Sequence, residues 1–431
     1  MEPIAQPYWH SVTLDRDACR GCTNCLKQCP TQAIRIQSGK AKILKERCID
    51  CGECIRVCPY HAKQAATDSL SMLSDYDFRI ALVAPAFYGQ FSKTEDCDLI
   101  LTALLQLGFD DVFEVARGAQ EISLETRRLL AGGELMKPAI SSACPAVSRL
   151  IAVRFPNLIH HIVPLRSPME LSAEAARREA VQKTGLSPQR IGIFFISPCA
   201  AKATAVKSGT ETKKSQVDGV IAMKDVYLRL AQKLSHIDRP LPLSKAGSLG
   251  TRWANSGGEA EGSKAARRIS VDGIHNVIQV LEDIEDDRLS DIEYVEALAC
   301  PGGCVGGPLT AENSFVARSR IERVCQSLPP RQGTIDAAID RYWDGAPVYR
   351  HSTGIWKRQC RWPSKLKKSP GVFPVWTAAP ADHPAAAPWQ RILYAATPAR
   401  TTAFLSCAKS CAVCSAGTIK KIPEKHKEAS L

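Results

Sequence analysis

The stretch VEALACPGGCVGGPL, from Val295 to Leu309, joins an apolar run to a glycine-rich loop. The apolar run is typical of a buried strand, and the loop carries two cysteines, Cys300 and Cys304, with no histidine or third cysteine nearby. Two thiolates are half of a metal site, so the other half has to come from elsewhere in the chain. Comparable strand-like runs occur at residues 77–87, 111–116, 137–145, 190–199, 217–223 and 292–300.

Amphipathic segments at residues 94–108 and 273–284 have apolar residues three and four apart and are predicted to be helices. Strands that alternate with helices predict an α/β domain with mostly parallel sheets. Sites in such domains gather beyond the carboxyl ends of strands, and three of the expected strands end close to Cys144, Cys199 and Cys300. Together with Cys304 these residues predict one four-thiolate site.

A second group of cysteines lies near the N-terminus, in CRGCTNCLKQCP (19–30) and CIDCGECIRVCP (48–59). This doubled C-x2-C-x2-C-x3-C-P run resembles the bacterial ferredoxin module with two [4Fe-4S] clusters, in which the fourth cysteine of each run serves the other cluster. The resemblance implies that one cluster binds Cys19, Cys22, Cys25 and Cys58, and the other Cys48, Cys51, Cys54 and Cys29. Zinc is the alternative, because paired C-x2-C units also bind it, but the two complete runs with proline at each end favour clusters.

The segments SSACPAV, ISPCAAK and VEALACPGGC resemble the three signature loops of the [FeFe]-hydrogenase catalytic domain, and the whole resemblance covers residues 12–345. It implies an α/β fold with a ferredoxin-like domain at 1–68 and a two-lobed catalytic domain at 77–345. It further implies that Cys144, Cys199, Cys300 and Cys304 bind a third [4Fe-4S] cluster. Cys304 would also bridge to a two-iron unit with CO and cyanide ligands, forming an H-cluster, and Lys202 would donate to an iron-bound cyanide.

The same resemblance assigns cofactor-lining positions and reveals departures. Ala84 and Pro85 match the backbone stretch that lines the two-iron pocket. Ala143 replaces the cysteine that relays protons in fast enzymes, and Ala205 replaces a glutamate. Two methionines that crowd the site in the family are replaced here by Ser197 and Leu298. This combination resembles the sensory hydrogenases, which keep the active-site metal and give up fast turnover.

The expected function is therefore an iron–sulfur oxidoreductase of [FeFe]-hydrogenase type, a hydrogen sensor or a hydrogenase of low turnover. Its substrates would be H2 and protons, and electrons would pass through the two N-terminal clusters to or from a carrier such as ferredoxin, with a signalling partner in the sensory case. The alternative is a non-catalytic electron carrier or assembly scaffold with only a cubane in the four-cysteine site. Lys202 and the glycine-rich third loop favour the first function, whereas Ala143 and Ala205 favour the second.

The composition of the chain indicates its cellular compartment and the classes of partner that it can bind. The chain has 431 residues and 18 cysteines, with no apolar run of membrane-spanning length and no signal-peptide pattern, so we expect a cytoplasmic protein whose cysteines bind metal. The net charge is +12, but residues 351–431 alone carry a surplus of +10. A nucleic-acid partner would require clustered charge on a folded face, and none is evident.

Residues 351–431 abandon the α/β pattern and are expected to form an irregular basic tail. Back-translation of the stretch around residues 373–390 permits a further cysteine module in another frame, so we suggest a frameshift between about residues 346 and 358, real or a sequencing error. A native disordered tail is the alternative. Cys97 and Cys325 lie on apolar helix faces and are predicted to be core residues.

Overall fold

The computed structural model describes residues 9–92, 95–209, 214–335 and 339, all within one compact unit. The predictions made for residues 351–431 lie outside the described residues. The α/β class and the ferredoxin-like start of the chain are both confirmed.

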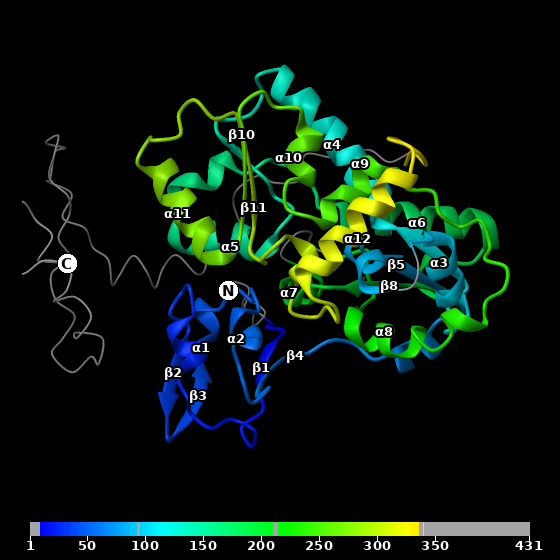
Figure 1. Cartoon of the computed structure of the whole chain (residues 1–431), viewed down its shortest axis with the longest axis horizontal. Helices are drawn as coiled ribbons and strands as arrows, with labels where there is room; N and C mark the ends of the chain where they lie inside the picture. The colour runs from blue at the N-terminus through cyan, green and yellow to red at the C-terminus, as the bar shows by residue number, and fades with distance from the viewer. Residues whose placement is uncertain (1–8, 93–94, 210–213, 336–338, 340–431) are drawn as a thin grey trace, which may run out of the picture. The chain divides into compact units, whose positions relative to one another are not determined.

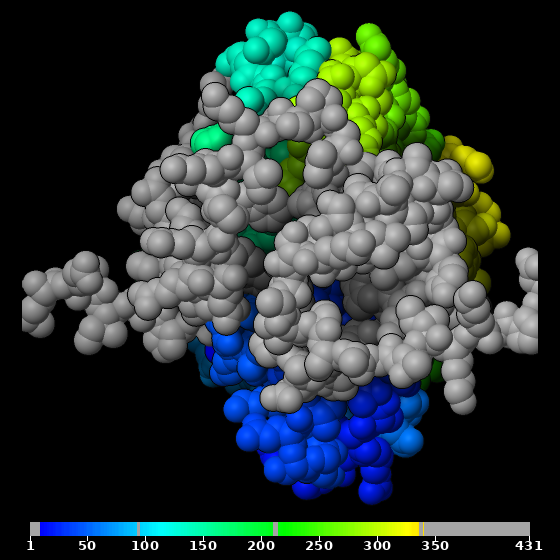
Figure 2. Space-filling view, turned by 90° about the vertical axis from the view of Figure 1, so that its left-hand side faces the viewer, coloured from blue at the N-terminus to red at the C-terminus, as the bar shows by residue number. Residues whose placement is uncertain are grey.

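The N-terminal module, residues 9–68, contains two antiparallel strand pairs and two one-turn helices (Figure 1; its outer surface is blue in Figure 2). Each helix follows a residue with positive φ, Thr23 at 68° and Gly52 at 77°, and each contains the third cysteine of its run, Cys25 or Cys54. The elements are β1 (Val12–Leu14), α1 (Asn24–Lys27), β2 (Ile34–Gln37), β3 (Lys40–Ile43), α2 (Glu53–Arg56) and β4 (Lys63–Ala65).

The larger of two parallel sheets has four strands in the order β6-β5-β8-β9. Its central strands are apolar and buried, as expected for a sheet covered on both faces. Helix α6 packs against β5, β6 and β8, and α8 packs against β8 and β9 (Figure 1). The strands are β5 (Phe78–Val83), β6 (Asp111–Glu114), β8 (Ile191–Ser197) and β9 (Gly219–Ala222), and the helices around them are α3 (Cys97–Leu105), α6 (Pro168–Thr184), α7 (Ala200–Ser208) and α8 (Met223–Leu230).

The smaller parallel sheet has the order β10-β11-β7, with β10 (Arg268–Asp272), β11 (Tyr294–Leu298) and the two-residue β7 (Ala139–Ile140). The sequence analysis did not identify β10, because only Ile269 and Val271 alternate with polar residues and the period-two signal is short. The other helices are α4 (Val115–Ala131), α5 (Pro145–Arg154), α9 (Ser248–Thr251), α10 (Gly258–Ser263), α11 (Ile274–Glu285) and α12 (Ser314–Ser327).

The core positions confirm two further expectations. Cys97 and Cys325 are both buried in the cluster of apolar residues around the four-stranded sheet. Cys144 follows β7 and Cys300 follows β11 in the small sheet, whereas Cys199 follows β8 in the large one. Because α5 contacts α7, the loops after strands of two different sheets meet, and the predicted four-cysteine site lies at that junction.

Candidate metal centres

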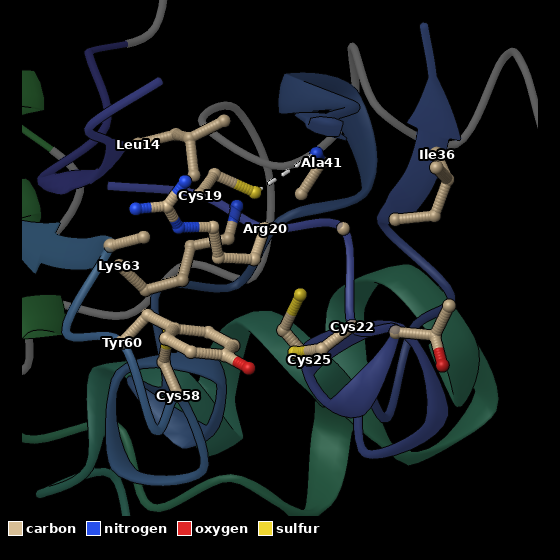
Figure 3. Close-up of a pocket in the computed structure, with 13 residues that line it drawn as sticks. Leu14, Cys19, Arg20, Cys22, Cys25, Ile36, Ala41, Cys58, Tyr60 and Lys63 are labelled. Atoms are coloured by element: carbon tan, nitrogen blue, oxygen red, sulfur yellow. Dashed lines mark hydrogen bonds between the residues drawn. The ribbon is translucent and has the colours of Figure 1, made fainter. Parts of the chain in front are cut away.

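Four cysteines of the N-terminal module line a hollow of about 320 Å³, and we call them the first thiol set (Figure 3). Cys22 is exposed, while the other three are buried. The backbone N–H of Ala41 donates to Cys19 Sγ at 3.4 Å. The members of the first thiol set are Cys19, Cys22, Cys25 and Cys58.

The remaining four cysteines of the module line a separate hollow of about 350 Å³ and form the second thiol set. Burial is the main influence on the acidity of Cys48, Cys51 and Cys54. It raises the pKa of the Cys54 thiol to about 12 and the pKa of Cys48 and Cys51 well above their usual range. The N–H of Ala33 donates to Cys29 Sγ at 3.2 Å. The members of the second thiol set are Cys29, Cys48, Cys51 and Cys54.

The two sets exchange their last members, so that Cys58 of the second run joins the first hollow and Cys29 of the first run joins the second. Within the described part of the chain, no three thiols approach within 4.8 Å of one another. Four thiolates on one zinc ion, with Zn–S bonds of 2.3 Å in a tetrahedron, would be about 3.8 Å apart. The wider spacing suits clusters in which each cysteine binds a different iron.

The buried ammonium group of Lys63 indicates, independently of the cysteines, whether the hollow of the first thiol set binds an anion. Its side chain lines the first hollow, the residue is only 2% exposed, and among the described residues its Nζ has no hydrogen-bond partner. A buried ammonium without a partner is costly, so an anion is expected beside it. A cluster held by four thiolates is such an anion, and the residues therefore fit [4Fe-4S] groups.

In the α/β part, Cys144 and Cys199 occupy equivalent positions at the N-termini of two helices. Cys144 is the N-cap of α5 and Cys199 the N-cap of α7, so both cysteines lie at the N-terminus of a helix. Burial raises the pKa of both thiols, that of Cys199 to about 11, while the helix N–H groups and Lys202 oppose the rise. Helix N-termini stabilise negative charge, and these two point at the thiols.

Cys300 and Cys304 lie on the loop after β11, which runs very close to other backbone. A Cβ added at Gly303, where φ is +97°, would lie 2.5 Å from the nitrogen of Ser256, and one at Gly307 would lie 2.2 Å from the carbonyl oxygen of Pro198. These approaches explain the glycines of this loop. They hold Cys304 at the junction, where its thiol is close to the other three.

The four thiols influence one another electrostatically, which shows that the structure brings them together. Burial raises the pKa of Cys304, and the charges of Cys199 and Cys144 raise it further. Lys202, 9% exposed, opposes the shift at Cys144, Cys199 and Cys304 alike. We call Cys144, Cys199, Cys300 and Cys304 the four-cysteine site. Lys202 is thus the lysine whose charge acts on three of these four thiols.

The other sequence-predicted positions lie close to this site or in the adjoining core. Ser197 is fully buried, and its Oγ accepts the N–H of Cys199 at 3.0 Å. Ala143 is partly buried, and its N–H donates to Ser141 Oγ at 3.1 Å. Ala84, Pro85 and Leu298 are buried, Ala84 and Leu298 at the 5% exposure level.

Sequence reasoning missed a pair of buried carboxyl groups beside the four-cysteine site. Glu259 accepts from Ser141 Oγ at 2.7 Å and from Tyr294 Oη at 2.6 Å, while Glu296 accepts the N–H groups of Gly257 and Ala260. Burial raises the pKa of Glu259 to about 7, and burial together with the charge of Glu259 raises that of Glu296 to about 8. The sequence did contain one indication of this pair, because Glu296 lies inside the apolar, strand-like run YVEAL.

The second thiol set adjoins the four-cysteine site. Ile49 belongs to the same apolar cluster as Ala299 and Ala201, and Cys51, Cys144 and Cys199 pack against that cluster. A Cβ on Gly52 would meet the side chain of Pro308 at 2.4 Å, so the loop that carries Cys51 and the loop after β11 are in close contact. The three groups of thiols therefore form a series from the exposed Cys22, through the second thiol set, to the junction of the two parallel sheets.

Comparison with known proteins identifies this arrangement. Residues 78–261 and 245–308 match the family described as "Iron only hydrogenase large subunit, C-terminal domain", and residues 11–59 match the "4Fe-4S dicluster domain". The first match covers more than half of the chain. The chain belongs to the iron-only hydrogenase family, as an iron–sulfur protein with a 4Fe-4S dicluster domain at its N-terminus.

Its similarity extends to relatives with different names. The chain is 26% identical over 373 residues to the periplasmic [Fe] hydrogenase large subunit of Nitratidesulfovibrio vulgaris, covering 71% of this chain and 88% of that protein. It is 23% identical over 346 residues to the cytosolic Fe-S cluster assembly factor NAR1 of Botryotinia fuckeliana, covering 59% and 58%. The third, iron hydrogenase 1 of Clostridium pasteurianum, is 24% identical over 262 residues, covering 48% and 44%. The chain thus spans about half the length of the last two.

Solved structures of [FeFe]-hydrogenases are also similar. One, from a study of oxygen inactivation of the H cluster, has a TM-score of 0.47 at 15% identity and covers 62% of this chain and 90% of that one. A variant of HydA1 from Chlamydomonas reinhardtii has a TM-score of 0.45 at 16% identity, covering 68% and 93%. None of the helices in the described part of the chain has the length and apolar character needed to cross a bilayer.

Proposed function

We propose that this protein is a hydrogen-sensing or low-turnover [FeFe]-type hydrogenase whose four-cysteine site holds a [4Fe-4S] cluster bridged through Cys304 to a two-iron CO/CN unit. The observation that carries the proposal is Lys202. Its charge acts on three of the four thiols, and its side chain is nearly buried. Lys202 lies on α7, three residues after Cys199. A cubane alone is satisfied by its thiolates, whereas a cyanide ligand beside it requires a donor of this kind.

Residues of this chain would bind the cluster, stabilise its charge, orient the two-iron unit and exclude water. Cys144, Cys199, Cys300 and Cys304 would bind the cluster, and the N-termini of α5 and α7 would stabilise its negative charge. Lys202 would orient the two-iron unit, and the buried walls formed by Ala84 and Leu298 would exclude water. When bound, that unit supplies the heterolytic chemistry of H2.

Electron transfer would use the two thiol sets in series. The second set adjoins the four-cysteine site through Ile49 and Cys51, and the first set approaches the surface at the exposed Cys22. A carrier protein such as ferredoxin would exchange electrons there. We propose a cytoplasmic location on the ground of the reduced, metal-binding cysteines.

A cubane-only scaffold or electron carrier is the second candidate, and specific observations favour it. Alanine stands at 143 and 205, so neither position can hold or move a proton. The relatives include a cytosolic Fe-S cluster assembly factor as well as hydrogenases. The two candidates share all twelve cysteine ligands and differ by the two-iron unit.

Infrared spectroscopy separates them. The full chain is matured anaerobically with a synthetic two-iron precursor, desalted, and measured with and without H2. The proposal expects retained cyanide and carbonyl bands that shift under H2. Full iron–sulfur absorption without such bands would instead establish the cubane-only function.

The matched variants are Lys202→Met and Lys207→Met, on the same helix. Lys207 pairs with Asp68 at 2.6 Å at the far end of α7. We expect Lys202→Met to shift the cyanide bands or lose the two-iron unit, with unchanged iron in the three cubanes, and Lys207→Met to leave the bands unchanged. Equal spectra for both variants would contradict the role given to Lys202.

A further inference from the structure

Lys63 lines the hollow of the first thiol set, and its strand β4 contacts α2, the helix that carries Cys54 of the second thiol set. It is the first residue of β4 and pairs with Leu14 of β1. The neighbouring positions His61 and Gln64 are exposed, whereas Lys63 is 2% exposed. Figure 3 shows its side chain extending from β4 along the wall of the first hollow toward Cys19.

Its charge reaches both thiol sets. In the first set, burial raises the pKa of Cys25, and Lys63 is the largest influence in the opposite direction. In the second set, burial raises the pKa of Cys54, and Lys63 is again the largest opposing influence. Cys19 also experiences its charge, together with that of Lys40.

Such a position is unfavourable unless an anion compensates it. Within the described residues Nζ makes no hydrogen bond, and burying an ammonium without a partner is strongly unfavourable. A cluster held by four thiolates provides such negative charge beside Nζ. Reduction adds one more negative charge to a cluster, so a fixed cation nearby stabilises the reduced form more than the oxidised form.

We propose that Lys63 is a positioning charge shared by the two clusters of the N-terminal module, which raises the reduction potential of both. The inference is independent of what the four-cysteine site contains. Under this proposal, the buried charge of Lys63 makes both clusters of the module easier to reduce by an electron donor at the surface.

The test is a potentiometric titration of the full-length, anaerobically purified protein, followed by electron paramagnetic resonance, with iron and sulfide counted for every variant. Lys63→Met keeps an unbranched side chain and removes the charge, Lys63→Arg keeps the charge, and Lys42→Met removes an exposed lysine of β3 in the same module. We expect Lys63→Met to lower the reduced-to-oxidised ratio of both clusters at a fixed potential by at least about tenfold, which is 59 mV for a one-electron couple. Lys63→Arg should restore most of the ratio, and Lys42→Met should leave it within about twofold.

Unchanged potentials in Lys63→Met at full iron content would overturn the proposal, and so would a shift confined to one cluster. Should Lys63→Met fail to retain its clusters, Lys63→Gln, which keeps a polar end group without the charge, is measured in its place against the same controls.

Discussion

Arg56 donates a 2.8 Å hydrogen bond from Nη1 to the carbonyl oxygen of Gly306, two residues beyond Cys304. Arg56 ends the one-turn helix that carries Cys54, so one side chain connects the second thiol set to the third loop. Its charge also opposes the rise that burial imposes on the pKa of Cys300. The guanidinium thus serves both the fold and the electrostatics of the four-cysteine site.

Removing this link should weaken the junction. For Arg56→Ala we expect a loss of about 1 kcal/mol in the free energy of unfolding, below the range for a fully buried charged hydrogen bond because the side chain is 25% exposed. Urea unfolding of the anaerobic protein measures it. Arg288→Ala is the control, since that side chain is 56% exposed and pairs only with acidic neighbours on its own segment. A loss at Arg56 no larger than at Arg288 would mean that the link contributes nothing to stability.

The crossed membership of the thiol sets predicts which substitutions act on the same cluster. Cys58→Ser should alter the paramagnetic signal that Cys22→Ser alters, although the two residues belong to different sequence runs. Cys29→Ser should alter the other signal, together with Cys51→Ser. Electron paramagnetic resonance of the reduced protein checks this. If Cys58→Ser instead behaves like Cys51→Ser, each run holds its own cluster.

Sequence alone predicted the α/β class, the strand ends and the cysteine pattern, because ligand spacing and apolar runs are local properties. Lys63 shows what it could not predict. Its burial depends on β4 pairing with β1, some fifty residues earlier in the chain, and nothing local distinguishes it from the exposed Lys42 of β3. The carboxyl pair was missed for the same reason, since Glu259 and Glu296 meet only when α10 packs against β11.

The third loop should not tolerate a side chain at Gly303. Both Gly303 and Gly39 have positive φ, +97° and +69°, but a Cβ at Gly39 meets nothing within 4 Å, whereas one at Gly303 meets Ser256 and Asn255 backbone below 3.0 Å. Gly39→Ala should therefore cost only the conformational term, about 1 kcal/mol. Gly303→Ala should lower the free energy of unfolding by more than that. It should also remove from the protein the iron that the four-cysteine site holds. Urea unfolding and iron analysis measure both effects, and equal losses at the two glycines would show that the close approach is unimportant.

The buried carboxyl pair should make stability depend on pH. The folded pKa values of about 7 for Glu259 and about 8 for Glu296 exceed the ordinary value of 4.5, so folding favours the protonated forms. The contribution to stability is fully present below about pH 4.5 and is lost as pH rises through 7 and 8. Between pH 6 and 9 we expect a fall of more than about 1 kcal/mol in the free energy of unfolding. Glu296→Gln should reduce the fall, while Glu322→Gln, at a 52% exposed position on α12, should not. An identical pH profile for all three proteins would contradict the assignment.

Cysteine at position 143 should increase turnover if the proposed hydrogenase function holds. Ala143 directly precedes Cys144, its N–H is held by Ser141 Oγ, and its methyl group offers no proton. A positioned acid–base group contributes about 10²–10⁴-fold, so Ala143→Cys should raise the rate of H2 oxidation by about 10²-fold. Ala143→Ser is the control, because a hydroxyl of similar size has a far less suitable pKa than a thiol. Rates are compared at equal intensity of the carbonyl infrared bands, so that occupancy of the site does not enter. A rate unchanged in Ala143→Cys at equal occupancy would show that proton delivery does not limit this protein, and that the slow step lies in electron transfer through the two thiol sets.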